Sequence, residues 1–263
     1  MKIKFLSSAL LVLFSAVAVC YGQKTKTFQV GKVSFTMVYV EGGDTVIGRT
    51  SDQDSRFTSF STMYSGGTLW NDPVQVTLDD YWIGQTEVTQ ELWEAVMGEN
   101  PSTSKDNPKQ PVTDISWDDC MVFVTRLSGL TGERFRMPTE AEWEYAARGG
   151  VKSQYYRFSG SNDNQEVGWD VPTYAVATKK PNVLGIYDRT GCVREWCKDG
   201  CIQKDILHGG DNPQGRNRTG YNVFRGGMIV GVAERNAGKP DLKLYNIGFR
   251  LAKAVKKTVI IEE

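Results

Sequence analysis

The chain has 263 residues, and its 31 basic side chains balance 31 acidic ones, so the formal net charge is zero. This balance, together with the lack of a long basic run, excludes nucleic acid as the main partner. Apolar residues make up 40% of the sequence and charged residues 24%, which is typical of a soluble globular protein. Because glycine occurs 27 times and aromatic residues make up 11%, we expect a loop-rich domain with an aromatic core.

Residues 1–22 have the pattern of an export signal. Two lysines precede an apolar run over residues 5–19, which is shorter than the roughly 20 residues that a membrane-spanning helix needs. Cleavage of this signal would leave Gln23 first, and the protein would be periplasmic or secreted. Cys20 leaves open a lipoprotein, which would be associated with a membrane only through a lipid on that residue. A retained anchor is the third alternative.

The chain after the signal predicts short strands separated by loops. Residues 23–27 form a polar leader, and residues 49–72 are rich in Ser, Thr, Asp and Gly without periodicity, which predicts a long surface loop. Runs of β-branched and aromatic residues predict strands at 33–40, 45–48, 74–78 and 81–83, the last two paired across a turn at 79–80.

Two helices are expected next, each with a hydroxyl side chain at its N-cap. Thr89 begins the first, which Gly98 ends. Ser116 begins the second, where Asp119 completes a capping box, and Gly129 ends it.

A third helix is predicted between Thr139 and Gly149. Glu142 completes a capping box with Thr139, and Gly149 stands where a chain leaves a helix in the left-handed conformation. Trp143 shares one face with Ala146 and Ala147, and this face should be buried. The acidic residues of the helix are expected to face elsewhere, with basic partners at its two ends; these are Glu140 and Glu144, with Arg136 and Arg148.

Residues 151–222 predict an aromatic-rich loop region with short strands, such as 173–177, and closing strands are expected at 223–225 and 249–252. Neither a linker nor a repeat is evident. The sequence therefore predicts one coil-rich α+β domain over residues 28–256, followed by a tail at 257–263.

Export would place the cysteines in an oxidising compartment. Cys192, Cys197 and Cys201 are close enough in the sequence for one local disulfide, but spacing does not choose the pair. Cys120 lies on a predicted helix face, where we expect a buried free thiol.

Several separated segments, in order, resemble the formylglycine-generating enzyme, or sulfatase-modifying factor, family. The resemblance implies a fold like that of C-type lectins, in agreement with the coil-rich α+β class. The segments that carry it are MVYVEGG at 37–43, EVT at 87–89, residues 111–119, the third predicted helix with its flanks at 136–150, PNVLGIYD at 181–188, RGG at 225–227 and IGFR at 247–250.

The resemblance also implies a structural calcium ion in the loop that follows residue 187. Its ligands would be the side chains of Asp188 and Glu195 and the carbonyl groups of Gly191 and Val193. Carboxylate and carbonyl oxygens are the hard ligands that calcium prefers. In the alternative, the two carboxylates pair with the neighbouring Arg189 and Arg194, and no metal binds.

Catalysis in this family implies a copper ion held by two cysteines shortly after the Arg-Gly-Gly segment. The present chain has no cysteine after Cys201, so the copper-binding pair is absent. Another branch of the fold binds iron through several histidines, but His208 is the single histidine of this chain. We therefore expect neither copper nor iron.

These features favour a non-catalytic member of the family that acts as a binding or structural protein of the bacterial envelope. Its ligand would be a protein or an acidic glycan. The alternatives are a metal-dependent oxidase of the formylglycine-generating type with an altered site, and a scaffolding subunit. The candidate binding groove is basic and follows the Arg-Gly-Gly segment, with Arg225, Met228, Arg235 and Lys239.

Overall fold

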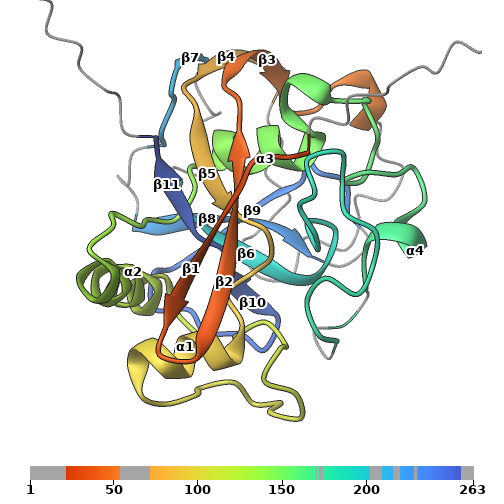
Figure 1. Cartoon of the computed structure of the whole chain (residues 1–263). Helices are drawn as coiled ribbons and strands as arrows, with labels where there is room; N and C mark the ends of the chain where they lie inside the picture. The colour runs from red at the N-terminus through yellow and green to blue at the C-terminus, as the bar shows by residue number, and fades with distance from the viewer. Residues whose placement is uncertain are drawn as a thin grey trace, which may run out of the picture.

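A computed structural model describes residues 22–53, 72–169, 171, 174–201, 209–215, 220–227 and 230–255 (Figure 1). Most of the expected signal with Cys20, most of the loop predicted at 49–72, and the tail lie outside these residues. Met228 and His208 lie outside them too. Within the described ranges, no helix combines the length and the apolar character that a membrane crossing requires.

The first sheet is antiparallel and contains both ends of the described chain. Its strands follow the order β1 (Thr25–Val30), β2 (Val33–Val40), β5 (Tyr81–Gly84) and β11 (Ala252–Ala254). The prediction of a polar leader at 23–27 is wrong, because residues 25–27 belong to β1, which pairs with β2 along its whole length. The aromatic ring of Phe28 stacks on Phe35 with ring centres 5.5 Å apart, which compensates for the polar character of β1.

Two further sheets complete the domain. One consists of β3 (Gly43–Ile47), β4 (Val74–Leu78) and β7 (Gly210–Asp211), and the other has the order β10 (Ile247–Phe249), β6 (Gly191–Cys201), β8 (Tyr221–Gly227) and β9 (Arg235–Gly238).

The predicted β4–β5 hairpin is wrong. β4 pairs with β3, whereas β5 pairs with β2 and β11. The chain changes sheets at this point, where the Asp80 carboxylate accepts hydrogen bonds from the Gly42 amide at 2.8 Å and from the Tyr39 hydroxyl at 2.6 Å.

The three predicted helices are confirmed as α1 (Gln90–Met97), α2 (Trp117–Thr131) and α3 (Glu140–Arg148), with their expected N-caps. The C-terminus predicted for α2 is wrong. The helix passes Gly129 and ends at Gly132, whose φ of +69° lets its amide bond to the Ser128 carbonyl group.

The second half of the chain is more regular than predicted. The eleven-residue β6 runs through the region expected to be mostly loop, and a short helix, α4 (Asn164–Val167), lies before it. The strand expected at 173–177 is wrong, because its described residues, 174–177, form a bend and a turn.

The core of the described residues has three parts. Helices α1 and α2 pack against β1, β2 and β10, and at the centre of this part Trp93 stacks on Phe123 with ring centres 5.0 Å apart, while Phe249 meets both rings edge-on. The other two parts meet at α3. Ala141 and Tyr145 pack with β2, β4 and β5, whereas Trp143 and Ala147 pack with β6, β8 and β9.

Candidate functional site

Helix α3 is buried on every side, since each residue from Glu140 to Arg148 is buried. The predicted burial of Trp143, Ala146 and Ala147 is therefore confirmed. The expectation that Glu140 and Glu144 face elsewhere is wrong, because both are fully buried. Helical periodicity predicted one apolar face and did not predict that other elements would cover the acidic face.

Glu140 is neutralised by two arginines from the third sheet. The Glu140 Oε1 atom lies 2.8 Å from Arg225 Nη1 and 2.7 Å from Arg235 Nε. Burial alone would raise the pKa of Glu140, but the charges of Arg235 and Arg225 outweigh it and hold the pKa below its usual value. This carboxylate is therefore ionised and engaged.

Glu144 joins the same network from the next turn of the helix. Arg225 binds its Oε2 atom, and Arg148 donates to its Oε1 atom at 2.8 Å. Arg148 also reaches Asp52 at 3.0 Å and the Gly48 carbonyl group at 2.7 Å. The predicted Arg148–Glu144 pair is confirmed, whereas Arg136 pairs with Glu142 instead.

The arginines of this network do not form the predicted groove. Arg225 is 0% exposed and Arg235 is 3% exposed, so neither guanidinium group can line an open surface. Lys239 is exposed, and Met228 lies outside the described residues. The Gly-Gly pair of β8 serves packing, because a Cβ atom at Gly226 would lie 2.9 Å from the Trp143 ring and one at Gly227 would lie 2.6 Å from Arg194.

Asp199, a residue of β6, holds the first turn of α3 in place. Its two carboxylate oxygens accept hydrogen bonds from the amides of Glu140 at 2.7 Å and Gly215 at 2.6 Å. Burial, with a contribution from the nearby Glu140 charge, raises the pKa of Asp199 to about 7.

The calcium loop expected after residue 187 is wrong as a loop, because β6 begins at Gly191 and contains Val193 and Glu195. In this strand, Glu195 is held by Arg250. Two bonds of 2.6 Å join the carboxylate to the Arg250 guanidinium group, and the Trp143 indole donates a third at 2.8 Å. Arg250 comes from the closing IGFR segment, so the partner is neither Arg189 nor Arg194.

Asp188 and Glu87 retain unused oxygens near this ion pair. The Asp188 Oδ2 atom accepts the Ala177 amide at 2.6 Å, while its Oδ1 atom is buried and makes no hydrogen bond within the described structure. Burial raises the pKa of Asp188 to about 6. Both Glu87 oxygens are also buried without a hydrogen bond, and the Arg250 Nη2 atom lies 3.9 Å from one of them. Glu87 belongs to the EVT segment, and its position in the sequence predicted no role for it in a site.

The residues of the implied calcium site meet only part of what the ion requires. Asp188 offers a buried oxygen without a hydrogen bond, and it lies three residues before Gly191, where the strand that also contains Val193 begins. Glu195, in contrast, would have to share oxygens that already accept three hydrogen bonds. Among the described residues, no three His, Cys, Asp or Glu side chains converge as metal ligands.

The candidate cysteines do not form the expected local disulfide. Cys192 and Cys197 carry buried free thiols, so neither is bridged to the other or to Cys201. Cys197 packs in the core cluster of Trp143, whereas Cys192 lies in the electrostatic field of Glu87 and Asp188. The free buried thiol predicted for Cys120 is confirmed.

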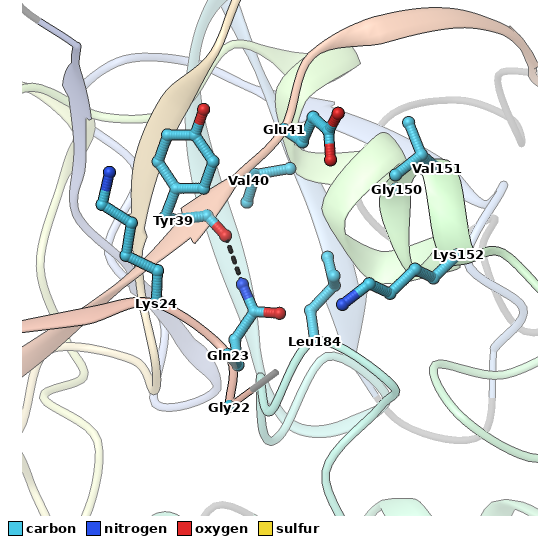
Figure 2. A pocket seen from close by; sticks show the side chains of 10 residues that line it. All are labelled: Gly22, Gln23, Lys24, Tyr39, Val40, Glu41, Gly150, Val151, Lys152 and Leu184. Atoms are coloured by element: carbon cyan, nitrogen blue, oxygen red, sulfur yellow. Dashed lines mark hydrogen bonds between the residues drawn. The ribbon is translucent and has the colours of Figure 1, made fainter. Parts of the chain in front are cut away.

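Several cavities open between the described elements. A small one of about 140 Å³ lies beside the end of β2, where Gln23 donates a hydrogen bond to the Tyr39 carbonyl group (Figure 2). A larger one of about 650 Å³ lies between the start of α3, β6 and β11. Two others, of about 350 and 560 Å³, share residues with the larger one.

The sequence profile described as sulfatase-modifying factor enzyme 1-like domain matches residues 24–255. The chain belongs to this sulfatase-modifying factor family. Its similarity to known proteins also supports the fold expected from the resemblance. One solved structure that resembles this fold is variable protein 1 of Treponema denticola, which is 29% identical in sequence. The two superpose with a TM-score of 0.71, and the match covers 88% of this chain and 99% of that one. PvdO from Pseudomonas aeruginosa superposes with the same TM-score at 21% identity, over 88% of this chain and 98% of that one.

Two relatives in sequence carry different names. A protein of Paenibacillus barcinonensis, named chaperone protein LppX, is 33% identical over 63% of this chain and 71% of its own length. The formylglycine-generating enzyme of Streptomyces coelicolor is 30% identical over 55% of this chain, and the match spans about half of that enzyme, 53%. Membership of the sulfatase-modifying factor family therefore does not by itself assign an activity.

We predict that Arg225→Met lowers the free energy of unfolding by about 3–5 kcal/mol, because it leaves two buried carboxylates short of a partner. Urea unfolding measures this loss. The control is Lys180→Met, which removes an exposed ion pair with Glu166 and should leave stability unchanged. Equal stability of Arg225→Met and the wild type would contradict the proposed importance of the network. If Arg225→Met does not fold, Arg225→Lys provides a milder loss of the paired hydrogen bonds.

Asp199 should make stability depend on pH. Its pKa in the folded protein, about 7, lies above the ordinary value near 3.9, so its contribution is complete below about pH 4 and is lost as the pH rises to 7. The stability of the wild type relative to Asp199→Asn should therefore fall between pH 4 and 7 and stay level above that. Urea unfolding across this range tests it, with the exposed Asp163→Asn as the control. A flat difference for Asp199→Asn would show that the carboxyl group is not perturbed.

Proposed function

We propose that the protein is a non-catalytic member of the sulfatase-modifying factor family that is exported and acts as a binding or structural protein of the bacterial envelope. One observation carries this proposal. The oxidases of this family, as the resemblance implies, hold copper with two cysteines after the Arg-Gly-Gly segment, and residues 202–263 of this chain contain no cysteine.

The remaining cysteines are poorly suited to replace that pair. A thiolate, not a thiol, is the metal ligand and the nucleophile. Cys120, Cys192 and Cys197 are 0–1% exposed, and burial raises the pKa of each thiol above its ordinary value. They remain protonated at neutral pH, which argues against an altered oxidase site built from them.

The surroundings of the Arg-Gly-Gly segment also favour a structural role for it. The Arg225 guanidinium group is occupied by Glu140, Glu144 and the Val232 carbonyl group at 2.8 Å. A relative named as a chaperone gives precedent for a family member whose task is binding. Export is supported by the apolar run at 5–19 with its preceding lysines.

We predict that the mature protein, incubated with copper and oxygen, leaves a cysteine-containing sulfatase peptide unchanged. Mass spectrometry of the peptide and elemental analysis of the protein for copper and iron provide the measurement. The formylglycine-generating enzyme of Streptomyces coelicolor is the positive control. Conversion of the peptide, or stoichiometric copper or iron in the protein, would overturn the non-catalytic assignment in favour of the oxidase.

We also propose that Asp188 and the first residues of β6, Gly191, Val193 and Glu195, hold a structural calcium ion. The buried Oδ1 atom of Asp188, which makes no hydrogen bond, supports this proposal, because a buried charged oxygen is costly without a partner. Calcium would supply that partner and would stabilise the fold rather than take part in a reaction.

Calcium should therefore raise the melting temperature of the protein, and a chelator should reverse the increase. Asp188→Asn removes the charge at nearly constant shape and should abolish the response to calcium. Glu195→Ala is unsuitable, because it would break the Arg250 ion pair whether or not calcium binds. A melting temperature that does not change with millimolar calcium would contradict the site, and the exposed Asp163→Asn should respond as the wild type does.

A further inference from the structure

The cavity of about 560 Å³ lies where the start of α2 meets β6, β8 and the segment after β7. Its volume is within the range of roughly 300–1,000 Å³ that is typical of sites for small ligands. Its lining combines one aromatic ring and one cation with small or uncharged groups. The lining residues are Trp117, Met121, Lys198, Gly200, Gln214, Gly215 and Asn222, and we call this space the Trp117 cavity.

The indole ring of Trp117 is fixed in the wall of this cavity. Its Nε1 atom donates a hydrogen bond of 2.8 Å to the Cys197 carbonyl group of β6. The ring packs against the core beside α2 and remains partly exposed. Among the described residues, no second aromatic ring and no cation lies over it. A flat apolar surface that is already oriented can bind another ring with little loss of side-chain freedom.

Lys198 carries the only charge among the described residues that line the Trp117 cavity. It is half-buried, and no described carboxylate forms an ion pair with it. The next residue, Asp199, is fully buried, and both of its oxygens accept backbone amides. Asp119 of α2 pairs with Lys243.

Lys198 also borders the cavity of about 650 Å³, where acidic side chains occur. These acids have other partners. Glu142 binds Arg136 through two bonds of 2.6 Å, and the Asp80 carboxylate accepts two hydrogen bonds. Asp79 also has a partner. The ammonium group of Lys198 is therefore available to a negatively charged ligand in the Trp117 cavity.

The remaining walls favour a ligand with hydroxyl groups over an extended peptide. Gln214 is exposed, and its side-chain amide, which forms no hydrogen bond within the described structure, can both donate to and accept from a hydroxyl group. The bordering strands are interior ones, because β6 lies between β10 and β8, and β8 lies between β6 and β9. A peptide backbone finds no open strand edge here to pair with.

We propose that the Trp117 cavity binds a uronic acid residue of an acidic glycan. The C–H groups on one face of the sugar ring stack on the indole of Trp117, whose face carries the negative part of the ring quadrupole. The sugar carboxylate approaches Lys198, and a hydroxyl group binds Gln214. One carboxylate matches one ammonium group, whereas a nucleotide with several phosphate charges would be left poorly neutralised. This inference rests on the proposed binding role, and it places the ligand at α2 and β6 rather than at the buried Arg225.

The ligand class is tested with two matched sugars. Isothermal titration calorimetry measures the binding of a trimer of galacturonic acid to the mature protein. The control is the trimer of galactose with the same linkage, which carries a hydroxymethyl group in place of each carboxylate. The acidic trimer should bind at least tenfold more tightly than the neutral one, and this preference should shrink as the salt concentration rises.

The stacking contact is tested with Trp117→Leu, which keeps an apolar side chain but removes the ring. It should weaken binding of the acidic trimer about tenfold or more, whereas Trp117→Phe, which keeps a ring, should stay within about threefold of the wild type. Trp82→Leu removes a partly exposed indole that does not line the cavity, so it is the matched control and should have no effect.

The charge is tested with Lys198→Met, which removes the ammonium group and keeps most of the apolar stem. Affinity for the acidic trimer should fall about threefold to tenfold, while affinity for the neutral trimer should not change. Lys105→Met, at an exposed lysine that does not line the cavity, should bind as the wild type does. Melting temperatures confirm that each variant is folded. If Trp117→Leu does not fold, Lys198→Met with the two trimers decides the proposal.

Four results would overturn the inference: no binding of the acidic trimer at millimolar concentration, equal affinity for the two trimers, binding that neither Trp117→Leu nor Lys198→Met weakens, or displacement of the trimer by an octapeptide of alternating valine and glutamate whose own binding depends on Trp117. The last result would assign the cavity to a polypeptide. These failures differ from failure of the non-catalytic role, which is decided by conversion of the sulfatase peptide. A protein that neither converts that peptide nor binds the trimer would lose only the glycan site.

Discussion

The buried network of carboxylates and guanidinium groups around α3 is the interaction on which the domain depends. It joins Glu140 and Glu144 to Arg148, Arg225 and Arg235, and its bonds from α3 to β8 and β9 connect residues that are 81 to 95 positions apart in the sequence. Asp52 supplies a third acid, so three negative charges meet three positive ones. Such groups can be buried only when every partner is in place, because an isolated charge in the interior is costly. The network therefore requires α3, the loop after β3, and strands β8 and β9 to be assembled together.

This requirement changes the meaning of the Arg-Gly-Gly segment. In the sequence it marks the point after which the oxidases of the family, by resemblance, place their copper ligands. In the structure its arginine neutralises α3, and its two glycines let the chain pass close to Trp143 and Arg194. These contacts stabilise the fold, and they do not depend on the copper-binding cysteines that this chain lacks. The presence of the segment is therefore no argument for catalysis, and its buried arginine offers no open surface for the proposed ligand.

Local chemistry was predictable from the sequence, and long-range pairing was not. The caps at Thr89, Ser116 and Thr139 placed three helices correctly, because a cap depends only on residues within one turn. The pairing of β4 and β5 was wrong, since the partner of a strand is decided by distant segments. The partners of Glu140, Glu195 and Asp199 were missed for the same reason. Sequence resemblance supplied the family and the fold, whereas the burial of Glu140 and Glu144 became visible only in the structure.

The position of β1 and β11 at the two edges of one sheet also sets the order in which the domain can fold. The sheet unites residues 25–30 with residues 252–254 through two inner strands, so its pairing spans nearly the whole described chain. Contacts between such distant residues form slowly, because a long loop has to close first. Until the last strand is available, β5 keeps an exposed edge that can associate with other chains. A chain that emerges gradually from a ribosome would thus complete its first sheet only after residues 252–254 have appeared, and the edge of β5 would need protection until then.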